Sequence, residues 1–253
     1  MFADDTTVHS TDKDITALGQ RLQQSLDEVS AWCKDNSMVV HPVKTKSMVI
    51  ATRQKHQIRP LSLDLFLGDN PIEQVTEHRV LGVVIDNQLT WKAHTISLSK
   101  TISRKLFMLS KLKHLLDFES RKIFFNAQVR SHFDYASTVW DGYSDNHMKK
   151  LISLHRRAAK LILPDPLLST DEKLSTCGIL PLRQHLLYNK AMFMHKVCHN
   201  KVPEYLSQLF RPSTSQYGKQ NGLFIIPYTR IDIFKSSLSY SGADMWNKLP
   251  GNM

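Results

Sequence analysis

Two kinds of sequence pattern meet at residues 78–91, which read HRVLGVVIDNQLTW. The apolar run inside this segment predicts a strand, and Gly82 within the run indicates a bulge or a close approach of the backbone. Earlier in the chain, short apolar runs at 47–51 and 61–67 predict further strands, the second because apolar residues alternate with others. From residue 92 onward the apolar spacing changes from 2 toward 3.6, which predicts helices.

Helices are expected on both sides of this segment. Apolar residues at 12–36 recur every three or four positions, so this stretch predicts a helix that Thr11 or Asp12 caps. Further helices are predicted at 92–115, 118–133, 145–163 and 181–200, with Pro164 and Pro166 ending the third and Pro181 starting the fourth. Residues 211–236 are predicted to form loop and one strand, and residues 237–250 a short docked segment. The predicted fold class is therefore α+β.

The composition excludes several classes of protein. A chain of 253 residues buries enough surface to need neither disulfides nor a metal for its core. The apolar fraction of 42% argues against disorder, and three cysteines are too few for a disulfide framework. There is no apolar run of ~18 residues, and the acidic N-terminus does not resemble a signal peptide. We expect an intracellular chain of the nucleus or cytoplasm, neither secreted nor membrane-bound.

The basic excess is concentrated in the middle of the chain. Residues 92–163 carry 14 basic and 5 acidic side chains, whereas residues 1–91 carry 9 and 12. This distribution favours a polyanionic partner such as nucleic acid. The best candidates for phosphate contacts are Lys149, Lys150, Arg156, Arg157 and Lys160. We predict that these five do not all share one helix face, so an ordinary solvated helix remains the alternative.

Two other groups of residues have both a functional and a structural interpretation. The adjacent carboxylates of Asp4 and Asp5 fall at a predicted turn, where they could hold the Mg²⁺ ions that assist phosphoryl transfer. Turns also favour Asp for local hydrogen bonding, so the pair alone is a weak signal. Aromatic and Met side chains could stack bases, but their helical spacing favours a core role; these are Phe124, Phe125, Phe133, Trp140 and Met148.

Several blocks, taken in order, resemble the reverse transcriptases of non-LTR (LINE-type, jockey/RTE-like) retrotransposons. The string FADDT at 2–6 resembles the family's [Tyr/Phe]-x-Asp-Asp box, and HPVKTKSMVI at 41–50 is similar to its next palm motif, although the family often has Asn in place of His41. Residues 78–94 are similar to the primer-grip region. The remaining blocks are similar to the thumb and to the terminal signature: residues 135–140, 151–163 and 241–250 (SGADMWNKLP).

The resemblance implies the C-terminal part of such an enzyme. Residues 1–91 would form part of the palm with a primer-grip-like segment. Residues 92–163 would form a basic helical thumb, and residues 164–253 a post-thumb region of helices with a loop and strand segment. An RNA template and a DNA primer are the implied partners, without a membrane.

The resemblance also implies roles for single residues. Asp4 and Asp5 would be the catalytic, metal-binding pair, with Mg²⁺ or Mn²⁺ as cofactor. Lys44 and Lys46 would lie near the incoming nucleotide or departing pyrophosphate, although solvated loop lysines are the favoured alternative. Leu81 and Gly82 would be primer-grip-like, although a structural role is favoured for the glycine.

The resemblance sets an expectation about activity as well. The acidic pair begins at residue 4, so the fingers and the first catalytic Asp of the family are expected to be absent from this chain. Asp64 and Asp86 follow the predicted palm helix and are not obvious substitutes. The alternatives to a polymerase fragment are a non-catalytic RNA–DNA duplex-binding fragment and a transposon relic without function. A partner chain that carries the N-terminal half would complete the enzyme.

We therefore expect the purified chain alone to show no polymerase activity. Primer extension with template RNA, dNTPs and Mg²⁺ measures this directly, because loss of one residue of a catalytic unit already costs about 10⁴–10⁶ in turnover. The matched control carries Asp4→Asn and Asp5→Asn. Template-dependent incorporation above that control would contradict the expectation.

Overall fold

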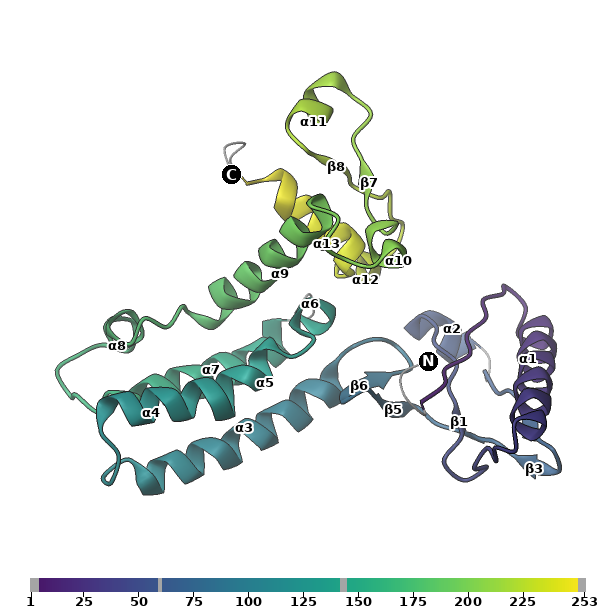
Figure 1. Ribbon diagram of the computed structural model, residues 1–253, viewed down its shortest axis with the longest axis horizontal. Coiled ribbons are helices and arrows are strands. Elements are labelled where there is room, and N and C mark those ends of the chain that lie inside the picture. Colours follow the sequence, from purple (N-terminus) through teal and green to yellow (C-terminus); the bar gives the residue numbers. More distant parts are fainter. Residues whose placement is uncertain (1–4, 59–60, 142–144, 250–253) are drawn as a thin grey trace. The chain divides into compact units, whose positions relative to one another are not determined.

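The computed structural model describes residues 5–58, 61–141 and 145–249, and the chain divides into two compact units, Met1–Ala93 and His94–Met253 (Figure 1). Long helices and short strands occur together, which confirms the α+β class. The assignment of palm and thumb stays a prediction. Among the helices of the described ranges, none combines the length and the apolar character needed to cross a lipid bilayer.

The first unit contains one long helix and a set of very short strands. The elements are α1 (Ile15–Asp35), β1 (Lys46–Ser47), α2 (Arg53–Ile58), β2 (Phe66–Leu67), β3 (Asn70–Pro71), β4 (Glu73–Gln74), β5 (Glu77–Val80) and β6 (Val83–Asp86). β1 pairs with β4 in parallel, whereas β2–β3 and β5–β6 are antiparallel hairpins. The long strands predicted at 47–51 and 61–67 are therefore wrong in extent.

Helix α1 is capped by a different residue from the ones predicted. The carboxylate of Asp14 accepts a hydrogen bond from the backbone N–H of Ala17 at 2.9 Å, which satisfies a free donor of the first turn. Asp12 instead accepts from the Asp14 N–H at 3.0 Å and lies 3.1 Å from the Arg21 guanidinium. The cap predicted at Thr11 or Asp12 therefore lies two or three residues too early.

The core of the first unit forms where α1 meets the segment at 61–72. Alternate residues of this segment are buried, as the sequence pattern predicts, even though only its end is paired in a sheet. Ile15, Leu22 and Leu26 of α1 pack against this cluster. Its buried members are Val49, Leu63, Leu65, Leu67 and Ile72. Burial of such side chains contributes about 1.5–3 kcal/mol each, which holds α1 on the hairpin.

The predicted strand from Val80 to Ile85 is instead a tight hairpin. Leu81 and Gly82 form its two-residue turn, with φ of 46° and 83°. Positive φ at both central positions is the mark of a type I′ turn, which matches the twist of the flanking strands. Gly82 is thus neither a bulge nor a mid-strand residue, and Leu81 is exposed at the tip of the turn.

The loop after this hairpin is organised by the buried carboxylate of Asp86. Its Oδ1 accepts hydrogen bonds from the backbone N–H groups of Gln88 and Thr90 at 3.1 and 2.9 Å. Its Oδ2 accepts from the Thr90 hydroxyl at 3.1 Å and from the Trp91 N–H at 2.8 Å. These bonds fix the backbone immediately before the next helix. The carboxylate is therefore occupied in a structural role.

The second unit is mostly helical. Its helices before residue 200 are α3 (Lys92–Leu112, which begins in the first unit), α4 (Phe118–Phe125), the π-helix η1 (Asn126–Arg130), α5 (Ser131–Asp134), α6 (Ser137–Trp140), α7 (Asp145–Ile162), α8 (Thr170–Thr176) and α9 (Leu182–Cys198). The proline boundaries of α7 and α9 are confirmed. The single helix predicted at 118–133 is interrupted by η1. Its aromatic side chains Phe125 and Phe133 are buried, as are Trp140 and Met148, which supports the core role.

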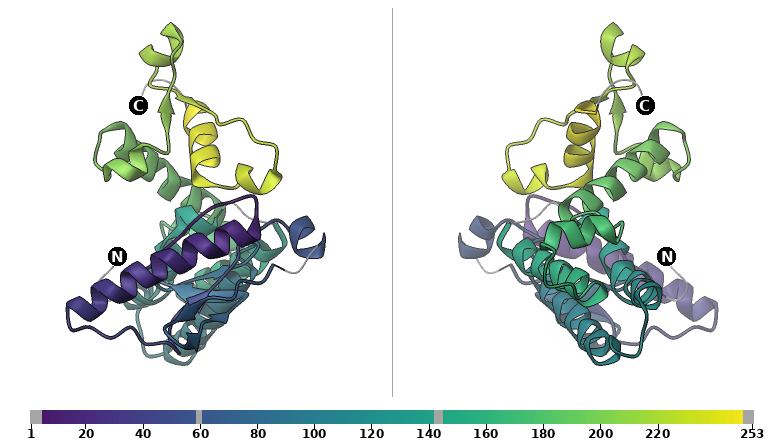
Figure 2. Two further views of the ribbon diagram at one scale, coloured as in Figure 1. Left: turned by 90° about the vertical axis from the view of Figure 1, so that its right-hand side faces the viewer. Right: turned by 90° about the vertical axis from the view of Figure 1, so that its left-hand side faces the viewer.

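The C-terminal part of the second unit packs on α9. It comprises α10 (Glu204–Ser207), β7 (Arg211–Pro212), α11 (Gln216–Gln220), β8 (Phe224–Ile225), α12 (Asp232–Lys235) and α13 (Leu238–Asn247). Strands β7 and β8 are antiparallel. Both views of Figure 2 show α13, coloured yellow, beside the green segment that holds α9. The segment predicted at 237–250 is therefore a docked helix.

A buried ion pair joins α9 to two other helices. The Lys190 ammonium lies 2.9 Å from Oδ1 of Asp141, which follows α6, and donates to the Ser241 hydroxyl of α13 at 3.1 Å. The side chains of Lys190 and Asp141 are only 8% and 7% exposed. Burial raises the pKa of Asp141, whereas the nearby Lys190 opposes that shift.

The terminal segment 241–249 acts as a clasp on the same core. A Cβ on Gly242 would lie 2.9 Å from the sulfur of Met194, so a larger residue here would force the Met194 side chain or α13 to shift. The Asn247 amide accepts from the Phe224 N–H at 3.0 Å and donates to the Phe224 carbonyl at 2.8 Å. The Trp246 indole donates to the Gly222 carbonyl at 3.2 Å. The side chains of segment 241–249 therefore hold β8 against α13.

We expect Asp86→Ala to lower the free energy of unfolding by about 3 kcal/mol, because it leaves several donors of the 87–91 loop without an acceptor. Urea-induced unfolding followed by circular dichroism measures the change. Asp64→Ala is the matched control, since it removes the same charge from an exposed side chain. It should shift stability by no more than about 0.5 kcal/mol. Equal effects of the two variants would refute the role given to Asp86.

Candidate nucleic-acid interface

Helix α7 has one buried face and one basic face. Its buried side chains pack toward α4, α8 and α9 and include Met148, Leu151, Leu154, His155, Ala158, Ala159 and Ile162. All five predicted phosphate-contact residues are exposed. At about 100° per residue, these five positions fall within an arc of about 120°. The prediction that they do not share one face is therefore wrong, and we call Lys149, Lys150, Arg156, Arg157 and Lys160 the basic stripe.

Most of the basic stripe is available to a partner. Arg156 lies 3.7 Å from the Asp171 carboxylate of α8, and both side chains are well exposed, so this pair is weak. Lys150, Arg157 and Lys160 have no ion-pair partner in the described part of the chain. Parallel cations on one rigid helix face are suited to a nucleic-acid backbone, which repeats its phosphates regularly.

The predicted metal and nucleotide residues lie in the first unit. Asp4 lies outside the described residues, and the Asp5 side chain is exposed. Lys44 is exposed in the turn at 41–45, where its N–H donates to the His41 carbonyl at 3.2 Å. Lys46 of β1 instead forms an ion pair with Glu73, the residue opposite it on β4. Lys44 is therefore the better placed of the two lysines to meet an anion.

Potential metal ligands do not gather elsewhere in the described ranges. No group of three or more His, Cys, Asp and Glu side chains lies close enough to hold an ion there. The turn residues Leu81 and Gly82 protrude from the β5–β6 hairpin, where they could contact a partner's backbone. These predicted residues belong to the first unit, whereas the basic stripe belongs to the second.

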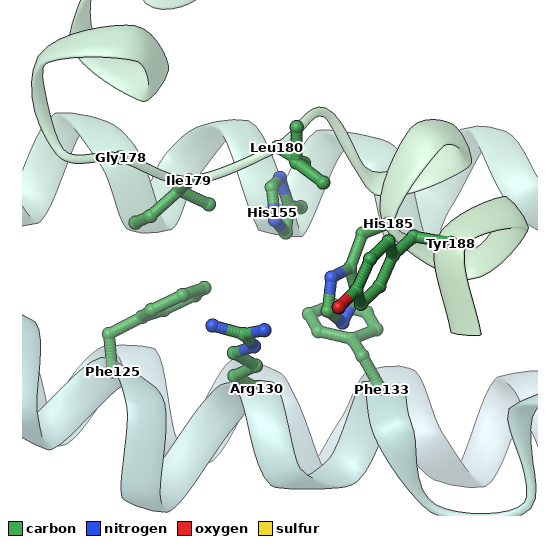
Figure 3. A pocket seen from close by; sticks show the side chains of 9 residues that line it. All are labelled: Phe125, Arg130, Phe133, His155, Gly178, Ile179, Leu180, His185 and Tyr188. Atoms are coloured by element: carbon green, nitrogen blue, oxygen red, sulfur yellow. The ribbon is translucent and has the colours of Figure 1, made fainter. Parts of the chain in front are cut away.

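A cavity of about 190 Å³ lies within the second unit (Figure 3). Phe125, Arg130 and Phe133 line one side and come from the α4–η1–α5 stretch. His155 of α7 lines another side, and the remaining lining residues are Gly178, Ile179, Leu180, His185 and Tyr188. Figure 3 shows the Arg130 guanidinium between the two phenylalanines, pointing into the cavity toward His155. The π-helix sets the position of Arg130, and such helices often occur at functional sites.

His155 is an unusual buried residue. It is 3% exposed, and its ring meets Phe125 and Phe133 edge-on at centroid distances of 5.9 and 5.7 Å. None of the described residues forms a hydrogen bond with its imidazole, and its ring nitrogens are not fully enclosed by protein. Burial lowers the pKa of His155 to about 4, with smaller effects from the charges of His185 and Arg130. The ring is therefore neutral at pH 7 and carries one donor and one acceptor.

A hydrogen-bonded network stands beside the cavity. His185 Nε2 bonds to Oδ1 of Asp134, which also accepts from the Asn189 amide at 2.9 Å. The Arg130 Nε lies 3.6 Å from Oδ2 of Asp134. Sequence reasoning missed this site, because Asp134 and His185 are 51 positions apart and no motif links them. The sequence offers one signal for it: the regular spacing of apolar residues along the predicted helix is interrupted near residue 126, where the π-helix begins.

Comparisons with known proteins place the chain near retrotransposon polymerases. It is 18% identical over 164 residues to a protein named "Probable RNA-directed DNA polymerase from transposon X-element", and 20% identical over 168 residues to one named "Probable RNA-directed DNA polymerase from transposon BS", both of Drosophila melanogaster. The matches cover 64% and 65% of this chain but only 18% of each relative. No family model matches, and no solved structure matches. The chain is thus distantly related to these polymerases.

The buried imidazole of His155 makes stability depend on pH. Its pKa is lower in the folded than in the unfolded chain, so the unfolded chain binds the extra proton as pH falls from about 6.5 toward 4. We expect stability to fall over this range by up to about 1.4 kcal/mol per pH unit from this group. His155→Leu should flatten the dependence, whereas the control His114→Leu, at an exposed position, should retain it. Urea titrations at several pH values measure this, and identical curves for His155→Leu and the unmodified chain would contradict it.

Proposed function

We propose that the chain contributes a nucleic-acid-binding part to a retrotransposon RNA-directed DNA polymerase, and that it grips the duplex of RNA template and DNA primer. The observation that carries this proposal is the basic stripe of α7, whose five cations share one exposed face. The distant relatives, which are named as RNA-directed DNA polymerases, support the choice of partner.

Electrostatics favours this use of the stripe over a merely solvated surface. A solvated helix needs no more than scattered charge, and exposed lysines often form pairs with acidic residues three or four positions away. Within the described part of α7, all the charged side chains from residue 148 to its end are cations. Their mutual repulsion is a cost that a polyanion would remove, with release of counterions from its phosphates.

We extend the proposal to the residues of the first unit. Asp4 and Asp5 would hold Mg²⁺ or Mn²⁺, because adjacent carboxylates offer the oxygen ligands that these ions prefer and the Asp5 carboxylate is exposed. The bound ions would stabilise the charge that develops during phosphoryl transfer. Lys44 would contribute a positive charge near the triphosphate, and the protruding turn of Leu81 and Gly82 would contact the primer backbone.

The chain matches about a fifth of the length of its relatives, so catalysis would require parts that lie elsewhere in such enzymes. We propose that binding, rather than nucleotide transfer, is the activity of this chain alone. A partner that carries the N-terminal half of the polymerase would supply the remaining groups. A non-catalytic role in holding an RNA–DNA duplex rests on the same stripe and differs only in the absence of that partner.

We expect the triple variant Lys150→Gln, Arg157→Gln, Lys160→Gln to weaken binding and its salt dependence together. Each lost phosphate contact reduces the slope of log K against log salt by about 0.9 for a B-form duplex, so the slope should fall by about 2–3. Fluorescence anisotropy with a labelled RNA–DNA duplex at several KCl concentrations measures it. Gln keeps the helix propensity of the replaced residues.

The matched control removes the same charge from other exposed positions of the second unit, through Lys196→Gln, Lys201→Gln and Arg211→Gln. This control should change the slope by less than about 0.9, the value expected for one phosphate contact. An equal loss in both triple variants would show that only net charge matters. If the unmodified chain binds the duplex weakly and its affinity does not change with salt, the proposal is wrong. The chain would then be interpreted as a transposon relic without function.

A further inference from the structure

We propose that the cavity between η1, α7 and α9 binds one unstacked nucleobase of a nucleic-acid strand, with guanine preferred. The inference rests on the proposed function, because a nucleic-acid partner is what would bring such a base to the protein. It adds a base-reading site to a chain whose stripe contacts only the phosphate backbone. Three features support it: the size of the cavity, the buried imidazole of His155 and the placement of Arg130.

The size and walls of the cavity fit a single planar ring. At about 190 Å³ it is smaller than the ~300–1,000 Å³ typical of sites for drug-sized ligands, so a base fits better than a whole nucleotide. Phe125 and Phe133 provide aromatic walls, and Ile179 adds an aliphatic one (Figure 3). Both phenylalanine rings are only 1% exposed, so they give the cavity an apolar lining rather than a free stacking surface.

The polar group at the back of the cavity points to a ligand with donors and acceptors. The His155 imidazole is 3% exposed, and the described residues give it no hydrogen-bond partner. Its ring nitrogens are not among the fully enclosed unpaired atoms of the described residues, so they remain open to a bound group. Since the ring is neutral at pH 7, it offers one N–H and one lone pair to the edge of a base rather than a charge to a phosphate.

Arg130 determines which base is preferred. Its Nε lies 3.6 Å from the Asp134 carboxylate, and among the described residues its terminal nitrogens belong to no ion pair. Two parallel N–H groups of this fork match the O6 and N7 acceptors of guanine. Adenine presents an amino donor where guanine presents O6, so the same fork opposes it.

The charges around the cavity favour a base over a free anion. The guanidinium of Arg130 is offset by the Asp134 carboxylate, which also accepts from His185 and Asn189. The neutral His155 adds no positive charge. A phosphate would therefore meet little net attraction here, in contrast to the basic stripe on the outer face of α7.

The test is a titration of the full chain, labelled with ¹³C in histidine, with guanosine 5′-monophosphate. The imidazole signal of His155, assigned by its loss in His155→Leu, should shift with guanosine 5′-monophosphate and respond at least about tenfold more weakly to adenosine 5′-monophosphate. Ribose 5-phosphate and inorganic phosphate should leave it unchanged. Equal shifts with inorganic phosphate would show an anion site, and no shift with either nucleotide would show that the cavity takes no base; either result overturns the proposal.

Two variants separate this site from the stripe. Arg130→Lys keeps the charge but loses the planar fork, so it should abolish the preference for guanine while the salt slope of duplex binding stays unchanged. The α7 triple variant should lose salt dependence while the His155 shift with guanosine 5′-monophosphate persists. Failure of the base site alone therefore leaves the proposed function standing. An unchanged guanine preference in Arg130→Lys would contradict the inference.

Discussion

The buried ion pair between Lys190 and Asp141 is the interaction on which the second unit depends. It ties α9 to the end of α6, and the bond from Lys190 to Ser241 extends the tie to α13. A buried pair gains little net free energy, but loss of one partner leaves an uncompensated charge and costs about 3–5 kcal/mol. The pair therefore specifies one position of α9, and that position sets the cavity side chains of His185 and Tyr188.

The sequence predicted the helices well because their ends have local causes. Proline fixes the limits of α7 and α9, and apolar spacing shows which face of each helix is buried. The strands were harder, since most are two residues long and depend on contacts far along the chain. The hairpin turn at Leu81 lacks the usual Asn-Gly signal, so its positive φ was not visible.

The candidate site was predicted only in part, for a different physical reason. The composition identified the basic residues of α7, but their common face was missed and emerged from the helical geometry. The cavity depends on residues from three segments that no spacing rule connects. Several blocks that suggested a polymerase prove to stabilise the fold: Asp86 orders a loop, the buried Trp140 bonds to the Tyr135 carbonyl, and Asn247 clasps β8. In this chain these blocks have structural roles, so their presence alone does not identify a catalytic group.

The π-helix at Asn126–Arg130 holds one residue more than an α-helical turn of the same height would. Each residue of a helix turns the direction of its side chain by about 100°. If residues 126–134 ran on as an uninterrupted α-helix, every later side chain of α5 would point about 100° away from its present direction, Phe133 and Asp134 included. The π-helix absorbs one extra residue, which lets Phe125 before it and Phe133 after it both be buried in the same core.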